Sequence, residues 1–198
     1  TVNSNDSIIA LIPANSSQSV CSNAAIQPIV YNLGGGATGG IVTVSPSQPV
    51  GITWQLSGNS ITISGISSSI GTFTYTVQSF GICGASTATG VITIKNIATT
   101  TLVSGITSTT LCQGSSFVTP IQFSILPSTA SMILSGSLPS GVTFNPITGI
   151  LTGTPTQSGS FSYTISSNTG CGNSISGVIT VNPLQAISFV SGNTNQSA

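Results

Sequence analysis

The chain has 198 residues, of which 1% are charged: Asp6 is its one acid, Lys95 its one base, and it has no histidine. A surface that binds nucleic acid needs clustered Lys and Arg, a calcium site needs several carboxylates, and a catalytic nucleophile needs a base. No apolar run approaches the ~18 residues of a membrane span. We therefore expect no enzyme, cofactor or metal site, no nucleic-acid binding and no membrane insertion.

Short segments in which apolar residues alternate with Ser or Thr recur along the chain and predict β-strands. Gly, Pro, Asn and Ser separate them at roughly ten-residue spacing, which is typical of β-sandwiches. The Ser and Thr positions predict a neutral outer face, and the aromatic and β-branched positions predict the core. In chain order the clearest strands are Ile61–Ile63, Phe73–Val77, Val91–Ile94, Phe161–Ile165 and Val178–Val181. We expect an all-β fold.

The sequence repeats itself. The segment Gly71–Val77 (GTFTYTV) returns as Gly159–Ile165 (GSFSYTI), 88 residues later (159 − 71). Cys83, which is followed by glycine, returns as Cys171 at the same offset (171 − 83 = 88). Such self-similarity indicates tandem domains of one kind.

A third copy of the repeat begins near the end of the sequence. Phe189–Gly192 (FVSG) echoes Leu102–Gly105 (LVSG), which opens the second copy. We predict one domain over residues 1–98 and a second over 99–185. Residues 186–198 are predicted to lead into a further repeat, so the chain has the pattern of a piece of a longer array.

Each predicted domain holds two cysteines, Cys21 with Cys83 and Cys112 with Cys171. Four cysteines allow three connectivities, and the repeat favours one disulfide within each domain, Cys21–Cys83 and Cys112–Cys171. A Cys83–Cys112 bridge is the alternative that would overturn the predicted domain boundary. A metal site is disfavoured because the chain has no CxxC pair and no histidine. Disulfides persist in oxidising compartments, so we expect an extracellular protein.

The stretch from Leu138 to Pro155, LPSGVTFNPITGILTGTP, is followed by GSFSY at Gly159–Tyr163. It closely resembles the "putative Ig" repeats of large bacterial surface proteins, which the first domain matches only in outline. The near absence of charge, the abundant Ser and Thr and the cysteine pair in each domain are similar to the giant adhesins of the Bacteroidota, including those of gliding bacteria. The resemblance implies two tandem Ig-like β-sandwiches within an array, and it carries no catalytic residue.

Two positions are candidates for contact with sugars. Asp6-Ser7-Ile8 matches the Asp-Ser/Thr-aliphatic motif on which Bacteroidota O-glycosylate exported proteins, so Ser7 is a candidate O-glycosylation site. Trp54 is a candidate platform for stacking on a sugar ring. Phe144 occupies the same position in the second repeat, however, which favours a core residue at Trp54.

These features favour a structural stalk segment of a secreted, repetitive adhesin on the bacterial cell surface, where it holds a binding tip away from the cell. Its partners would be neighbouring repeats of the same polypeptide. One alternative is an extracellular filament subunit, in which Ile8–Ile12 or Ala186–Val190 of one chain completes a sheet of the next. Another is a carbohydrate-binding module that binds surface glycans.

Little in the sequence titrates, so its stability should depend weakly on pH. With Asp6 expected to be exposed and the cysteines paired, the remaining groups are Lys95, the chain ends and three tyrosines. Stability changes with pH only where the folded and unfolded states bind different numbers of protons. We expect the melting temperature to stay nearly constant from about pH 3 to pH 9 and to fall where buried tyrosines must ionise.

Overall fold

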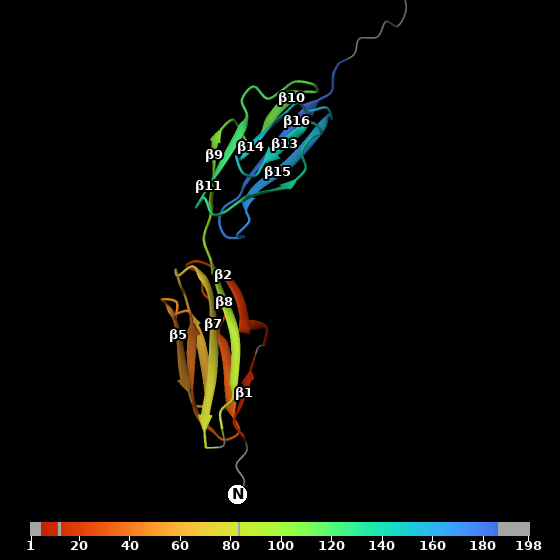
Figure 1. Cartoon of the computed structure of the whole chain (residues 1–198). Helices are drawn as coiled ribbons and strands as arrows, with labels where there is room; N and C mark the ends of the chain where they lie inside the picture. Colours follow the sequence, from red (N-terminus) through yellow and green to blue (C-terminus); the bar gives the residue numbers. More distant parts are fainter. Residues whose placement is uncertain (1–4, 12, 83, 186–198) are drawn as a thin grey trace, which may run out of the picture. The chain divides into compact units, whose positions relative to one another are not determined.

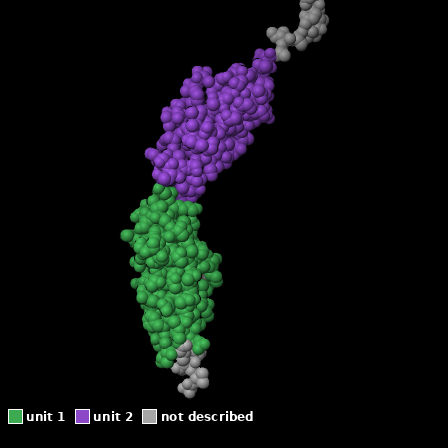
Figure 2. Space-filling model, viewed as in Figure 1, with its two compact units in different colours: residues 1–97 green, residues 98–198 purple. Residues whose placement is uncertain are grey.

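The structure is a computed structural model that describes residues 5–11, 13–82 and 84–185. The chain divides into two units, Thr1–Ile97 and Ala98–Ala198 (Figures 1 and 2). Within the described residues, each unit consists of two four-stranded β-sheets. The all-β fold of two sandwiches predicted from the strand pattern is therefore confirmed.

The first two strands of unit 1 belong to different sheets. One sheet has the strand order β1-β3-β6-β5 and the other β2-β8-β7-β4, so the chain passes from the first sheet to the second between β1 and β2. Neighbouring strands are antiparallel except β2 and β8, which are parallel. The elements are β1 (Ser7–Ala10), the 3₁₀-helix η1 (Pro13–Ser16), β2 (Ser17–Cys21), β3 (Ile29–Gly34), β4 (Ala37–Ser45), β5 (Ile52–Ser57), β6 (Ser60–Gly65), β7 (Gly71–Gly81) and β8 (Thr87–Lys95).

Unit 2 repeats this topology strand for strand. Its sheets have the orders β9-β11-β14-β13 and β10-β16-β15-β12, and again one pair, β10 with β16, is parallel. Each strand of unit 2 thus occupies the place of the strand numbered eight lower in unit 1. The strands are β9 (Thr99–Ser104), β10 (Thr109–Cys112), β11 (Ile121–Leu126), β12 (Met132–Gly136), β13 (Val142–Asn145), β14 (Ile150–Gly153), β15 (Gly159–Ser167) and β16 (Ile175–Asn182).

The alternation predicted from the sequence separates core from surface. On β7, Phe73, Tyr75 and Val77 are buried, whereas Thr72 and Thr74 are exposed. Successive side chains of a strand point to opposite faces, so this period of two buries one face of each sheet against the other sheet. The most deeply buried large side chains are Tyr31, Tyr75, Ile29, Ile61, Ile94 and Val77 in unit 1, and Tyr163, Phe123, Ile121, Leu151, Ile165 and Ile179 in unit 2.

A tyrosine in each unit holds the crossing between the two sheets. Tyr75 lies opposite Gly90 on the neighbouring strand β8, and its hydroxyl donates a 2.9 Å hydrogen bond to the backbone carbonyl of Ser16, the residue before β2. The absence of a side chain at Gly90 leaves room for the phenol, because a Cβ there would lie 2.2 Å from the Tyr75 hydroxyl oxygen. We call this arrangement the tyrosine clamp.

Unit 2 has the same tyrosine clamp. Tyr163 lies opposite Gly177 on β16, and its hydroxyl donates a 2.7 Å hydrogen bond to the carbonyl of Thr107, shortly before β10. Tyr163 is 1% exposed, so the hydrogen bond satisfies a polar group that burial would otherwise penalise. Because the clamp occurs at matching positions in both units, it is a structural feature of the repeat.

Unit 2 is expected to keep its stability up to about pH 10 and to lose about 2 kcal/mol by pH 12. Burial raises the pKa of Tyr163 to about 12, above the value of about 10 that an exposed tyrosine has in the unfolded chain. Between these values the unfolded state releases a proton that the folded state retains, so rising pH favours unfolding; below both, the contribution is fully present. Denaturant unfolding followed from pH 8 to about pH 11.5 measures the loss.

Tyr163→Phe is the matched control for this measurement, because Tyr163 is the single tyrosine of the second unit's sequence. The variant is expected to be less stable at pH 8, where it lacks the hydrogen bond, but to lose little more on going to high pH. If the free energy of unfolding of Tyr163→Phe falls as steeply with rising pH as that of the wild type, the loss does not come from Tyr163.

Candidate functional site

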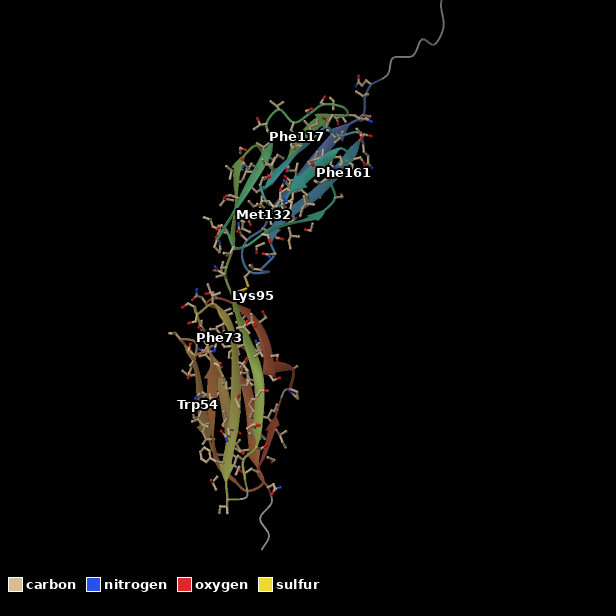
Figure 3. The ribbon with its side chains drawn as sticks, viewed as in Figure 1. Trp54, Phe73, Lys95, Phe117, Met132 and Phe161 are labelled. Atoms are coloured by element: carbon tan, nitrogen blue, oxygen red, sulfur yellow. The ribbon has the colours of Figure 1, made fainter. Side chains whose placement is uncertain are left out.

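Cys21 lies at the end of unit 1 where β8 finishes. It is the last residue of β2, and it pairs with Lys95, the last residue of β8 (Lys95 is labelled in Figure 3). The backbone N–H of Ser22 donates a 2.8 Å hydrogen bond to the Lys95 carbonyl, which fixes the cysteine beside this strand end. Since the chain leaves unit 1 after Ile97, Cys21 is positioned next to the exit of the unit.

Cys171 lies beside Ala98, the first residue of unit 2. It is 4% exposed in the turn between β15 and β16. Its backbone carbonyl accepts a 2.9 Å hydrogen bond from the N–H of Ala98 and a 3.0 Å hydrogen bond from the Thr169 hydroxyl. These bonds hold the turn against the start of the unit.

The bonding state of the cysteines corrects the predicted pairing. Cys21 and Cys171 are both disulfide-bonded, whereas Cys112 is a free, exposed thiol. The predicted Cys112–Cys171 bridge is therefore wrong, because Cys112 carries a free thiol. Cys83 itself lies outside the described residues.

Strand geometry explains why the predicted Cys112–Cys171 bridge within unit 2 fails. Cys112 pairs with Asn182 at the end of β16, while Cys171 precedes Ile175 at its beginning. Seven residues of strand separate these two ends, or about 23 Å. The Cα atoms of a disulfide lie about 4.4 to 6.8 Å apart, so Cys112 and Cys171 are at opposite ends of one sheet and out of reach of each other.

Trp54 takes the place predicted by its repeat partner. It lies half-buried on β5 opposite Ile63 and packs against the core of unit 1; Figure 3 labels its position. Phe144 on β13 packs against the core of unit 2 in the same way, with its ring 6.5 Å from that of Phe123. Trp54 therefore packs against the edge of the core and is partly, not fully, buried.

Trp54→Ala is expected to destabilise unit 1 by about 2 kcal/mol, because it removes half-buried apolar surface and leaves a gap at the core edge. Denaturant unfolding measures the loss, and Gln55→Ala, at the exposed neighbouring position, is the matched control. The same variants on a glycan array should give the wild-type signal. A Trp54→Ala variant of unchanged stability that loses a glycan signal would instead make Trp54 a sugar-stacking residue.

The predicted glycosylation motif lies at the start of β1. Ser7 is half-buried opposite Gly34, and a Cβ at Gly34 would lie 2.7 Å from the Ser7 hydroxyl oxygen. Asp6, which we expected to be exposed, is half-buried and accepts a 3.3 Å hydrogen bond from the Ser79 hydroxyl. That hydrogen bond explains the difference, because it ties the acid to β7. O-glycosylation of Ser7 stays a prediction.

The candidate donor strands of the filament hypothesis differ in what the structure describes. Ser7–Ala10 is the edge strand β1, paired antiparallel with β3 of its own unit. Ile9 and Leu11 are 62% and 54% exposed. Ile12 and Ala186–Val190 lie outside the described residues. The N-terminal segment therefore already completes a sheet of its own chain.

The described part of the chain has neither a cluster of metal-binding side chains nor a helix that could span a membrane. Within residues 5–11, 13–82 and 84–185, no three His, Cys, Asp or Glu side chains gather into a group suited to a metal ion. None of the helical residues described forms a segment long and apolar enough to cross a bilayer.

Comparison with known proteins identifies the fold. Residues 90–183 match the family described as "Putative Ig domain". Among solved structures, the chain is similar to the I-band fragment I67-I69 from titin, with a TM-score of 0.49 and 13% identity over 84% of this chain and 63% of that one. The E-to-A mutated variant of that fragment gives a TM-score of 0.52 and 10% identity over 92% and 66%.

The chain thus spans less than two thirds of the length of either titin fragment. No curated protein matches the sequence. At such identities the structural likeness shows an Ig-like fold and nothing further about function.

Proposed function

We propose that this chain is a structural spacer: two Ig-like units from the stalk of a secreted, repetitive bacterial surface adhesin, which hold a binding tip away from the cell. The observation that carries the proposal is that one sandwich is built twice in succession. Both units have the same strand order, the same tyrosine clamp and a cysteine at the same strand end. Tandem repetition of one unit adds length to a protein without adding a new site.

The surface chemistry suits a spacer. Hydroxyl groups form cross-strand pairs on the exposed faces of the sheets, at distances of 2.7 to 3.3 Å. A chain with one Lys and one acid cannot form a network of ion pairs, and these neutral hydrogen bonds take the place of such a network on the surface. Because salt screens charges and not neutral hydrogen bonds, a stalk of this kind keeps its stability as ionic strength changes. The paired residues are Thr72 with Thr93, Thr101 with Ser124, and Thr164 with Ser176.

The disulfide supports the proposed compartment. Cys21 and Cys171 are oxidised, and disulfides of this kind persist on cell surfaces and in secreted proteins, whereas the cytosol keeps thiols reduced. An extracellular stalk is the setting in which such a bond would last.

Exchange of the segment within the full-length protein tests the spacer role. Residues 7–182 would be replaced by an unrelated Ig tandem of equal length, and cell adhesion would be measured beside a variant that lacks the segment. A spacer predicts that the exchange preserves adhesion and that the deletion weakens it. Loss of adhesion on exchange, with the protein still displayed on the surface, would show that this segment itself binds the target and would overturn the proposal.

A further inference from the structure

We propose that a groove beside β10 in unit 2 binds an uncharged, extended peptide segment of a partner protein. The groove, which we call the β10 groove, is lined by β10 and by the segment that leads from β10 into β11, and it has a volume of about 380 Å³. Cavities of this size hold small ligands. The proposal goes beyond the spacer role, since a stalk unit can bind a partner along its side while it holds a tip away from the cell.

In unit 1 the matching place is closed by two amide side chains. The Nε2 of Gln18 donates a 2.7 Å hydrogen bond to the carbonyl of Gln27, and its Oε1 accepts a 2.8 Å hydrogen bond from the Gln27 N–H. The Nδ2 of Asn15 donates a 3.3 Å hydrogen bond to the carbonyl of Pro28. The carboxamide of Gln18 thus pairs with both backbone groups of one residue, as the N–H and C=O of a residue on an adjacent strand do.

Unit 2 lacks both amides. Matching the cysteines that end β2 and β10 gives an offset of 91 residues (112 − 21), which places Ile106 at the position of Asn15 and Thr109 at that of Gln18. The side chain of Ile106 has no hydrogen-bonding atom, and that of Thr109 is shorter than glutamine and has no N–H donor. Both residues line the β10 groove. The groove therefore lies where the amides of unit 1 form their bridges.

One wall of the β10 groove carries backbone groups without a partner. Thr119 corresponds to Gln27, because each directly precedes the proline before the third strand of its unit. Among the described residues, the N–H and C=O of Thr119 have no hydrogen-bond partner. The segment is one residue longer than in unit 1 (120 − 112 = 8 against 28 − 21 = 7), and its Val118 is 98% exposed. Its Phe117, labelled in Figure 3, packs against the core.

The opposite wall is the free edge of a sheet. β10 is the outermost strand of its sheet, with β16 on one side. The N–H of Gln113, directly after β10, donates to the carbonyl of Asn182 on the β16 side. Backbone groups alternate in direction along a strand, so those of Thr110, an odd number of positions earlier, point to the open side. An extended segment between the walls can therefore pair with Thr110 and Thr119, as peptides do when they add to a sheet edge.

The surroundings select an uncharged peptide. The sequence of unit 2 has no Asp, Glu, Lys, Arg or His. A charged side chain in the β10 groove would lose water without gaining an opposite charge. Apolar side chains find a favourable place instead, because Leu111 and Phe117 line the groove and both pack against the core. Alternation of small polar and apolar residues, as in the strands of this chain, meets these requirements.

NMR titration of the isotope-labelled chain with the capped peptide acetyl-TVTVT-amide tests the proposal. We expect saturable shifts of the backbone amide signals of Thr110 and Thr119. The same peptide with N-methylated backbone nitrogens lacks the donors that pair with a strand edge. It should bind about tenfold more weakly, because at least one hydrogen bond is lost.

Two variants restore the amides of unit 1. Thr109→Gln should weaken peptide binding by about tenfold or more, because the new carboxamide pairs with Thr119 as Gln18 pairs with Gln27. Ile106→Asn, at an exposed position, should weaken binding in the same direction. Thr143→Gln is the matched control, since it makes the same change at an exposed position of β13, outside the β10 groove, and should leave binding unchanged.

The absence of saturable shifts at Thr110 and Thr119 would overturn the proposal, as would undiminished binding by either folded variant that restores an amide. Equal binding of the N-methylated peptide would also overturn it, whether or not the variants fold. Saturable shifts of the same two amides with N-acetylglucosamine, but not with the peptide, would show a sugar site instead. Each of these results leaves the spacer role intact, since that role is tested separately by exchange of the segment in the full-length protein.

Discussion

Gly177→Ala is expected to destabilise unit 2 by about 3 kcal/mol, since the overpacking it causes also breaks a buried hydrogen bond. The new Cβ would lie 2.6 Å from the Tyr163 hydroxyl oxygen and closer still to the carbonyl oxygen of Thr107. Both atoms belong to the tyrosine clamp, so the phenol must move and its hydrogen bond is lost. At about 4 to 8 °C for each kcal/mol in a domain of this size, the melting temperature of unit 2 should fall by about 15 °C.

Calorimetry measures this loss, and two further variants locate its cause. Asn182→Ala, at an exposed position on the same strand, should change the melting temperature little. Gly90→Ala should lower the transition of unit 1 instead, because it meets the clamp of Tyr75. A Gly177→Ala variant that melts with the wild type would show that the contact with Tyr163 can be relieved without cost.

The strands and the core were predictable because they depend on local pattern. Phe73–Val77 and Phe161–Ile165 alternate in sequence, and the structure buries the residues that the alternation predicts, except that Phe161 is only partly buried. The tyrosine clamp was not predicted, although Tyr75 and Tyr163 match in the repeat. Its carbonyl acceptors lie 59 and 56 residues away in sequence, and the contact exists only after strands of both sheets have assembled.

The cysteine pairing could not be decided by the repeat. The repeat shows which cysteines correspond, but it does not show at which end of a sheet each one lies. The deciding fact in unit 2 is that β10 runs parallel to β16 and ends beside Asn182, far from the Cys171 turn that precedes β16. Strand direction of this kind arises from the tertiary fold, which the spacing of Cys112 and Cys171 does not encode.

The position of Lys95 also determines how the chain responds to proteases. Enzymes of the trypsin type cleave after Lys or Arg, and Lys95 is the one such residue in the sequence. It is exposed at the end of β8, the last strand of unit 1, and the next strand, β9, begins at Thr99 in unit 2. A cut after Lys95 therefore interrupts no strand, and each of the two fragments keeps all eight strands of its own unit. Such a cut would divide the peptide chain between two domains without removing a strand from either sandwich.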